Sequence, residues 1–326
     1  MHVLHVRNAE EGLFEGLNLL KMGGVWQDSR NGRVIRMEIP VATVYDSPLE
    51  RVVSSPIRDA NPFFHLYEAL WMLDGRRDVE GPARYAKNMM KYSDDGKVLH
   101  DAYGHRWIHY FGRNQVAQII QQLKANALDR QAVLQMWDAR EDLGRRGKAV
   151  PCNLTATFQV DPVWNKLDMV VFCRSNDIIW GTYGANAVHF GFLLEYVALK
   201  TGIPVGKYTQ ISVNYHAYEE QYNQCLPILN TEVLGYRNSY ICMPQDVDVH
   251  IQQVLACADH EKYVHRTPDR EFFQCDSEWG AMCHRMMWAH QLHRQGHTKD
   301  AFDMLYAAQV CDWTIAGRDW LFRRMQ

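Results

Sequence analysis

The spacing of the apolar residues changes once along the chain, near residue 245, and this change limits the folds that the chain can adopt. Before that point, helical spacing alternates with segments in which every second residue is apolar, whereas after it nearly all spacings are helical. The pattern predicts an α+β core over 1–245 and a helical extension over 246–326 that packs on the core. Helices are predicted over 10–22, 62–74, 114–127, 185–200, 277–295 and 298–311, and strands over 33–45, 131–137, 154–161, 167–174 and 207–213.

The composition excludes several classes of protein. A formal net charge of −3, with no stripe of Lys and Arg, argues against a protein that coats nucleic acid. No segment approaches the ~18 uninterrupted apolar residues of a membrane span, and the first residues lack the basic and long apolar regions of a secretory signal. We therefore expect a cytoplasmic protein with reduced thiols. None of the eight cysteines forms the C-x-x-C pair of zinc ribbons and thioredoxin-like sites.

Chemically reactive side chains gather between residues 150 and 190. Cys152 comes just before a predicted strand, the next strand ends in the run CRSND at 173–177, and Asn186 opens a helix. A thiol becomes a strong nucleophile when a nearby cation lowers its pKa. The arginine fork fits phosphate oxygens, and a carboxamide can read a ring edge that has both a donor and an acceptor. The segment therefore offers a nucleophile, a phosphate ligand and a group that recognises a ring.

Each of these residues, taken alone, also has a structural explanation. A single cysteine is usually a small buried apolar residue. An Arg-x-x-Asp pair usually forms a surface ion pair, and an asparagine at a helix start usually caps the helix. Glu68, before this segment, and His216, after it, also have structural explanations. Glu68 could be a buried structural acid, and His216 could be a core histidine.

Taken together and in this order, the motifs resemble the thymidylate synthase family, which includes the pyrimidine nucleotide hydroxymethylases. The resemblance covers about residues 13–225. The matching runs are DSRNG at 28–32, YEALWML at 67–73, AYGHRW at 102–107, LDRQ at 128–131, VPCN at 150–153, CRSND at 173–177, GTYGANAVHF at 181–190 and NYHAY at 214–218.

The resemblance implies a fold and a reaction. The fold is a mixed sheet flanked by helices, in a homodimer whose sheets pack back to back. The reaction transfers a one-carbon unit from 5,10-methylenetetrahydrofolate to C5 of a pyrimidine nucleoside monophosphate, without a metal. Cys152 attacks C6 of the ring, which makes C5 a nucleophile. Asp177 hydrogen-bonds the pterin of the folate.

The resemblance also implies how the phosphate is bound. Arg174 and Ser175 bind the 5′-phosphate, and Arg30 closes over it. Arg130 reaches the phosphate in the neighbouring subunit, so that each site of the homodimer is shared.

The same resemblance gives roles around the sugar and the ring. His216 and Tyr218 hold the 3′-hydroxyl, and Asn186 reads N3 and O4 of the base. Glu68 organises water and proton transfer near the ring, and Tyr103 assists removal of the C5 proton. Because a fixed amide donates to O4 and accepts from N3–H, the expected base is uracil rather than cytosine.

Several departures from the family pattern bear on the product. Asn153 follows the nucleophile where methylating members carry His, and Gln131 replaces the second of two paired arginines. One extra residue lies between Gly181 and Asn186, and the segment 89–92, MMKY, stands where the family has tryptophans. The expected short apolar C-terminal segment that closes over the folate is also missing. An open site, with Asn153 able to hold a water, predicts 5-hydroxymethylation of dUMP.

Other functions remain open at this level. Trp313 or Trp320 could supply a substitute lid, which would give a thymidylate synthase, and a flipped Asn186 amide would give a dCMP or CMP hydroxymethylase. A lapsed homologue would bind nucleotide or RNA only. The enzyme could be encoded by a virus and made in a host cytoplasm. A metal site is a further alternative, although helical spacing favours a packed helix for the residues concerned, Cys283, His284, His290, His293 and His297.

Overall fold

The computed structural model describes residues 1–231, 240–259 and 277–326. Part of the predicted extension, residues 260–276 with Cys275, lies outside the described residues. The strands are β1 (His2–Val6), β2 (Val25–Ser29), β3 (Gly32–Arg36), β4 (Val41–Tyr45), β5 (Val133–Gln135), β6 (Asn153–Val160), β7 (Leu167–Asp177) and β8 (Val205–Tyr218). The α-helices are α1 (Ala9–Gly23), α2 (Pro62–Leu73), α3 (Glu80–Tyr85), α4 (Tyr103–His105), α5 (Gln115–Ala125), α6 (Asn186–Thr201), α7 (Glu219–Cys225), α8 (Val247–Asp259), α9 (Glu278–Arg294), α10 (Thr298–Tyr306) and α11 (Asp312–Phe322). Short 3₁₀ or π-helical turns are η1 (Lys87–Tyr92), η2 (Arg106–Tyr110), η3 (Ile178–Ala185) and η4 (Leu226–Asn230).

The strands form one mixed sheet, as the resemblance implied. Its order is β1-β4-β8-β7-β6-β5, and the β2–β3 hairpin pairs with the end of β8. β7 and β8 run parallel, with Ser175 opposite Asn214 and Asp177 opposite His216. Because the two strands end at the same edge, the polar residues at their carboxyl ends lie next to one another.

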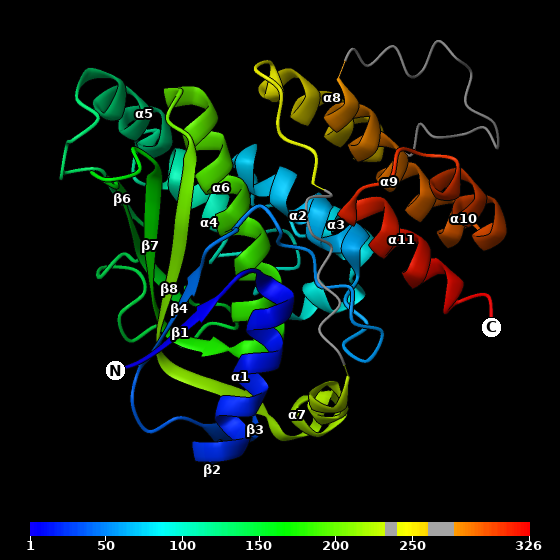
Figure 1. Ribbon diagram of the computed structural model, residues 1–326, viewed down its shortest axis with the longest axis horizontal. Coiled ribbons are helices and arrows are strands. Elements are labelled where there is room, and N and C mark those ends of the chain that lie inside the picture. The colour runs from blue at the N-terminus through cyan, green and yellow to red at the C-terminus, as the bar shows by residue number, and fades with distance from the viewer. Residues whose placement is uncertain (232–239, 260–276) are drawn as a thin grey trace.

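Helices cover one face of the sheet (Figure 1). The long helix α6 crosses that face, and α1 and α5 lie beside it. Burial alternates along β7, where Val171 and Cys173 are fully buried while Phe172 between them keeps 41% of its surface exposed. Among the residues that the structure describes, the second face of the sheet is therefore left open at this strand, although it carries apolar side chains.

Local signals explain where the main helices begin and end. The side chain of Asn8 accepts a hydrogen bond from the N–H of Glu11 and caps α1. Asn61 caps α2 in the same way, with Pro62 in the first turn. α6 ends at Gly202, whose φ of 75° is a left-handed conformation that favours glycine.

The α8–α11 extension packs against the core through α2, beside which it lies in Figure 1. The Trp320 indole meets Phe63 of α2 edge-on, at 5.5 Å between ring centroids, and Trp313 meets Phe192 of α6 at 6.0 Å. Both indoles are buried in these contacts. The alternative in which Trp313 or Trp320 lies over the folate as a lid is therefore wrong, because core packing already uses both rings. The division of the chain near residue 245 stays a prediction.

Candidate functional site

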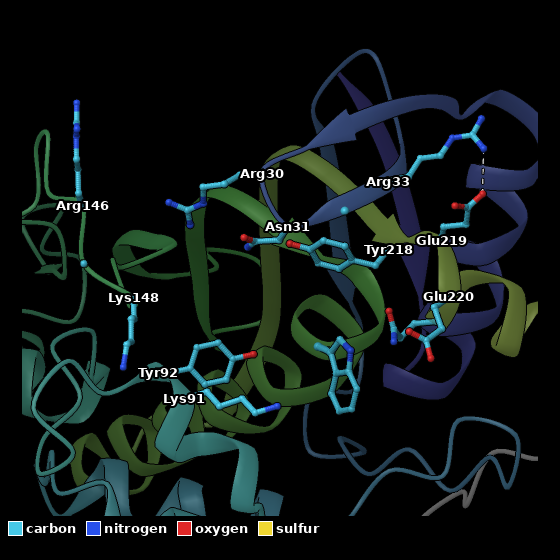
Figure 2. A pocket seen from close by; sticks show the side chains of 14 residues that line it. Arg30, Asn31, Arg33, Lys91, Tyr92, Arg146, Lys148, Tyr218, Glu219 and Glu220 are labelled. Atoms are coloured by element: carbon cyan, nitrogen blue, oxygen red, sulfur yellow. Dashed lines mark hydrogen bonds and ion pairs between the residues drawn. The ribbon is translucent and has the colours of Figure 1, made fainter.

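A cavity of about 830 Å³ opens beside the ends of β7 and β8, and its rim is mostly cationic and aromatic. Arg30, Tyr218, Tyr92 and Lys148 surround the same space from different elements (Figure 2). Three further cations line it, against two glutamates, Glu219 and Glu220. The full lining is Arg30, Asn31, Gly32, Arg33, Lys91, Tyr92, Arg146, Gly147, Lys148, Trp180, Tyr218, Glu219, Glu220 and Gln221. The excess of cations suits an anionic ligand such as a phosphate.

Cys152 is held at the start of β6 by contacts of its backbone. The Tyr103 hydroxyl accepts hydrogen bonds from the N–H groups of Cys152 and Asn153, at 3.0 and 3.1 Å. Tyr103 can reach them because α4 lies against the end of α2, where a Cβ at Gly104 would overlap the Met72 carbonyl. The glycine of the Tyr-Gly motif is thus needed for a close backbone approach.

Arg174 secures the other side of the same segment. Its Nε donates to the Pro151 carbonyl at 2.9 Å and its Nη2 to the Val150 carbonyl at 3.1 Å. Burial raises the pKa of the Cys152 thiol, and the Arg174 charge offsets only part of that effect. The expected influence of the arginine on the thiol has the predicted direction, but burial dominates it, so the thiol form prevails in the free site.

A buried chain of carboxamides fixes the orientation of Asn186. Its Oδ1 accepts from Asn153 Nδ2 at 3.2 Å, and its Nδ2 donates to Asn176 Oδ1 at 3.1 Å. Gln210 donates to Asn153 Oδ1 at 3.3 Å, and Asn176 donates to Ser212 Oγ at 3.0 Å. The network assigns the oxygen and the nitrogen of the Asn186 amide, and it leaves each of them one further hydrogen-bonding position.

The ends of β7 and β8 bring together the residues expected to bind phosphate and sugar. Asn214 Nδ2 donates to Ser175 Oγ at 3.2 Å. His216 Nδ1 lies 3.2 Å from the Asn214 carbonyl, to which it donates in the tautomer that carries the proton on Nδ1 and leaves Nε2 as an acceptor. The His216 ring meets Tyr218 edge-on at 5.5 Å.

Asp177 lies where β7 turns into η3. Its Oδ1 accepts the N–H groups of Ile179 and Trp180 at 2.8 and 3.2 Å, while its Oδ2 is buried without a partner among the described residues. Burial raises the pKa of the Asp177 carboxyl, with His216 acting in the opposite direction. A buried acceptor without a partner is the place where a ligand N–H can bind.

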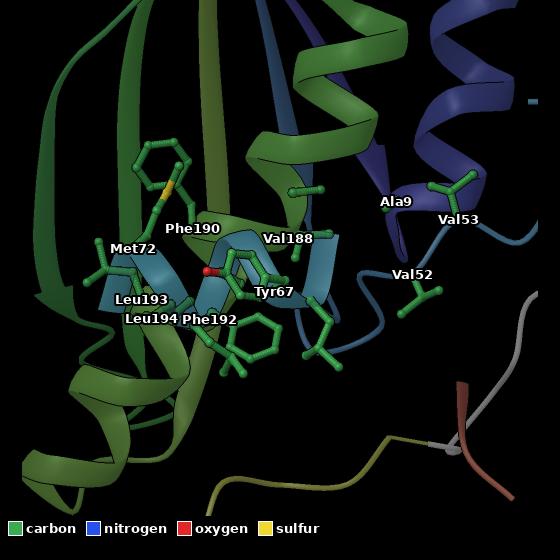
Figure 3. Close-up of a cluster of buried hydrophobic side chains, with 14 of the residues drawn as sticks. Ala9, Val52, Val53, Tyr67, Met72, Val188, Phe190, Phe192, Leu193 and Leu194 are labelled. Carbon is green, nitrogen blue, oxygen red and sulfur yellow. The ribbon is translucent and has the colours of Figure 1, made fainter. Parts of the chain in front are cut away.

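Glu68 lies on α2 and faces α6, the helix that begins with Asn186. The two helices pack through a buried apolar cluster (Figure 3). Within it, Glu68 Oε2 lies 2.8 Å from His189 Nε2, and neither atom has another partner among the described residues. Near this pair, burial raises the pKa of the Asp101 carboxyl to about 6, and the Glu68 charge adds to the effect.

Arg130 does not join this constellation within the chain. It is exposed beside β5 and does not line the cavity, whereas Arg30 and Tyr218 do. Ser175, Asp177 and His216 lie at the ends of β7 and β8. Sequence reasoning missed His189, Asp101 and Gln210. Gln210 could have been found from the alternation of β8, since it and Ser212 are polar residues in an inward series.

The described residues contain neither a group of metal ligands nor a membrane-spanning helix. Across 1–231, 240–259 and 277–326, no three His, Cys, Asp or Glu side chains are grouped as a metal site would need. In the same ranges, the helices are too short or too polar to cross a bilayer.

A family model described as thymidylate synthase matches residues 50–247. These residues are more than half of the chain and contain the site from Glu68 to Tyr218. The chain belongs to the thymidylate synthase family.

Individual proteins give a finer comparison. A deoxyuridylate hydroxymethyltransferase of Pseudomonas phage M6 is 44% identical over 334 aligned residues, which cover 99% of this chain and 95% of that protein. A deoxyuridylate hydroxymethyltransferase of Bacillus phage SP01 is 36% identical over 59% of this chain and 52% of its own length. The crystal structure of thymidylate synthase from T4 phage matches with a TM-score of 0.57 at 21% identity, covering 67% of this chain and 80% of that one, and so supports the fold.

Proposed function

We propose that the chain transfers a one-carbon unit from 5,10-methylenetetrahydrofolate to C5 of dUMP and completes the reaction with water, which gives a 5-hydroxymethyl nucleotide. The observation that carries the proposal is the buried carboxamide chain that holds Asn186 in one orientation beside Cys152. Its remaining N–H suits O4 of uracil, and its remaining lone pair suits N3–H. The relative from phage M6, similar along its whole length, has this activity in its name.

The cationic end of the cavity is the proposed phosphate site. Arg30 lines it, and the Arg174 guanidinium keeps N–H groups that its two carbonyl partners do not use. Ser175 at the end of β7 completes the phosphate ligands. His216 and Tyr218 hold the sugar hydroxyl; they lie two and four residues beyond Asn214, the β8 partner of Ser175.

The thiolate of Cys152 forms a bond with C6 of the ring, and C5 then forms a bond with the one-carbon unit that the folate supplies. The C5 proton leaves with the help of Tyr103, whose hydroxyl is fixed by the backbone of Cys152 and Asn153. The bond between the one-carbon unit and the folate nitrogen then breaks, which leaves an exocyclic methylene on C5 and releases tetrahydrofolate. Water adds to the exocyclic carbon, the C6–S bond breaks, and Cys152 is regenerated. Glu68 orders water and carries protons at the ring, and Asn153 keeps one amide N–H with which to hold the attacking water.

The residues around Asp177 fit a folate. Asp177 Oδ2 is a buried acceptor without a partner among the described residues, which suits a pterin N–H. Trp180 and Tyr92 on the cavity rim offer aromatic surfaces to a flat ring. Tyr92 belongs to the 89–92 segment, in which the tryptophans of the family are replaced.

A product analysis tests the proposal. The protein is incubated with 5,10-methylenetetrahydrofolate and, separately, with dUMP, dCMP, UMP or CMP, and the products are identified by mass spectrometry. We expect dUMP to gain the elements of formaldehyde, without an increase in dihydrofolate absorbance. A methylated product with stoichiometric dihydrofolate would indicate a thymidylate synthase instead. Failure to release tritium from C5 of dUMP would favour a protein that only binds nucleotide or RNA.

We also propose a homodimer in which the open sheet faces pack together and Arg130 acts in the partner's site. The exposed apolar side chains of that face include Phe172 and Val213, which are 41% and 43% exposed. Covering them would remove apolar surface from water. Arg130 is exposed and away from its own cavity, as a residue acting in trans would be.

Complementation tests the shared site. Arg130→Ala and Cys152→Ser chains are each expected to be inactive alone, but after mixing and subunit exchange about a quarter of the sites would combine an intact thiol with a partner's arginine. Recovery of activity near that fraction supports the arrangement. No recovery, despite heterodimers seen by native mass spectrometry, or a monomer at micromolar concentration by light scattering, would contradict it.

A further inference from the structure

The C-terminal end of α11 is joined to the loop before α2 through one carboxylate. Arg323 Nη2 and Nε donate to Asp59 Oδ1 at 2.8 and 3.1 Å. Arg324 Nη2 donates to Asp59 Oδ2 at 2.8 Å and its Nη1 to Oδ1 at 3.1 Å. Partial burial works to raise the pKa of the Asp59 carboxyl, but hydrogen bonds from Arg324 and Arg323 outweigh it and leave the pKa below its usual value. The carboxylate is therefore charged and held by two guanidinium groups.

The two arginines are themselves anchored in the packed extension. The Arg324 guanidinium lies 3.4 Å from the centre of the Trp320 ring system, and Trp320 is only 6% exposed. Trp320 packs on Phe63 in the first turn of α2. Asp59 is thus tied to a fixed part of the molecule.

Arg58, the neighbour of Asp59, connects this contact to the cavity. Its side chain is only 7% exposed, and its Nε donates to the Ile179 carbonyl at 3.1 Å. The Arg58 guanidinium lies 4.4 Å from the centre of the Trp180 ring system, and Trp180 lines the cavity with 51% of its surface exposed. The position of this exposed indole depends on Arg58.

We propose that the C-terminal extension acts as a fixed strap for the cosubstrate side of the site. Arg323 and Arg324 hold Asp59, so that Arg58 keeps Trp180 in the position that receives the flat ring of the folate. These are positioning residues, since they act through Trp180. This inference rests on the proposed function and gives the extension a role in it.

The contacts of Arg58 and Asp59 assign the strap to the cosubstrate rather than to the nucleotide. Among the described residues, the proposed nucleotide ligands Arg30, Arg174 and Asn186 make no hydrogen bond to Arg58 or Asp59. Asp177, by contrast, accepts the Trp180 N–H, so the segment that Arg58 supports also carries the buried acceptor without a partner.

The kinetic test compares wild type with the double variant Arg323→Gln/Arg324→Gln. We expect KM for 5,10-methylenetetrahydrofolate to rise about five-fold or more, since one partly exposed ion-pair cluster is lost. Both kcat and the Kd for dUMP should change less than about two-fold. Arg318→Gln on the same helix, whose guanidinium lies over Tyr306, is the matched control and should leave all three constants unchanged.

A second variant and a second measurement keep the test independent of folding and of turnover. Asp59→Asn removes the charge, and Asn tolerates the left-handed φ of 46° at that position. Hydrogen–deuterium exchange should increase in peptides covering 178–184 in both strap variants and stay at the wild-type level in Arg318→Gln. If hydrogen–deuterium exchange at 178–184 and the KM for 5,10-methylenetetrahydrofolate both equalled the wild-type values in these variants, the proposed strap would be wrong. A wild-type enzyme that makes no hydroxymethylated product would overturn the proposed function instead, and the exchange result would still decide the strap.

Discussion

Cys152 lies in a free site that favours its neutral thiol, because burial raises the thiol pKa more than Arg174 lowers it. The Cys152 thiol must therefore lose its proton when the nucleotide binds and replaces the water around the sulfur. The surrounding contacts fix where the sulfur lies, and they leave its protonation to change during the reaction.

Replacing Cys152 by Ser should abolish turnover and leave nucleotide binding. A hydroxyl is far less acidic than a thiol and forms no thiolate for attack on C6, whereas binding rests on Arg174, Ser175 and Asn186. We expect product formation below about a tenth of wild type, with the Kd for dUMP within about three-fold. Cys242→Ser, at an exposed cysteine, is the matched control. Activity above that level would remove Cys152 from the nucleophile role.

Replacing Asn186 by Asp should change the preferred base. An oxygen would then face both Asn176 Oδ1 and O4 of uracil, which are acceptors, whereas the amino group of cytosine can donate to it. Since an unpaired buried polar group costs ~1–3 kcal/mol, the ratio of kcat/KM for dCMP to that for dUMP should rise at least about ten-fold. Asn223→Asp, on the exposed side of α7, is the control. An unchanged ratio would mean that Asn186 does not read the base.

At the scale of elements, the sequence predicts the first helices closely and those of the extension less well. The helix predicted over 298–311 ends at Tyr306 as α10, and α8 and α11 were missed as separate helices. The helices predicted over 10–22 and 62–74 are observed as α1 and α2, within a residue of each predicted end. Apolar spacing and local caps, Asn8 for α1 and Asn61 for α2, carry this information within the segment itself.

Strands were harder to predict, for physical reasons that lie outside each segment. The strand predicted over 207–213 extends over 205–218, because residues 214–216 pair with the end of β7 and residues 216–218 pair with β3, partners that lie elsewhere in the chain. β2 was missed, since all of its residues are exposed and it has no alternation. β1 was missed as well. The catalytic motifs could be read in sequence, whereas the Asn186 network and the Glu68–His189 pair depend on tertiary contacts.

The contact between α4 and α2 leads to a prediction about Gly104. A Cβ at this position would overlap the Met72 carbonyl oxygen, which is backbone and has little freedom to move. Gly104→Ala should therefore lower the free energy of unfolding by about 1–3 kcal/mol and displace Tyr103, with a loss of turnover. Urea unfolding measures the first effect and product formation the second.

Gly23→Ala is the matched control for that substitution. At Gly23 the nearest atom to a new Cβ is Met37 Cε at 3.5 Å, an ordinary contact. Its free energy of unfolding should change by less than about 1 kcal/mol. If Gly104→Ala behaved like this control, the close approach of α4 to α2 would not be what positions Tyr103.

At the scale of the whole molecule, the buried histidines link stability to pH. Burial lowers the pKa of His65 and of His290 to about 3 and that of His284 to about 4. In the unfolded chain these groups titrate near ~6.5. Asp312 and Asp101 act in the opposite direction, since burial raises their pKa values to about 7 and about 6. Three groups that resist protonation in the folded state thus oppose two that favour it.

The sign of the pH dependence follows from these shifts. Below pH ~6.5 the unfolded chain binds protons at the three histidines that the folded chain does not bind, so stability is lost as the pH falls from ~6.5 toward ~4. Asp312 and Asp101 offset part of this loss, since their contributions are present at low pH and are lost as the pH rises from ~4 to ~7 and from ~4 to ~6. The free energy of unfolding should therefore fall by on the order of 1 kcal/mol for each pH unit between ~6.5 and ~5.

One substitution isolates a single contribution to this dependence. The His290 ring stacks on Tyr85 at 4.4 Å, so His290→Phe keeps the shape of the contact and removes the titration. Its unfolding free energy, measured by urea titration from pH 7 to pH 5, should show an average slope smaller than wild type by about 1 kcal/mol per pH unit. His297→Gln, at a partly exposed residue before α10, should keep the wild-type slope. Parallel curves for wild type and His290→Phe would mean that the extension opens and lets His290 titrate in water, and a strap built on α11 would then lack a rigid anchor.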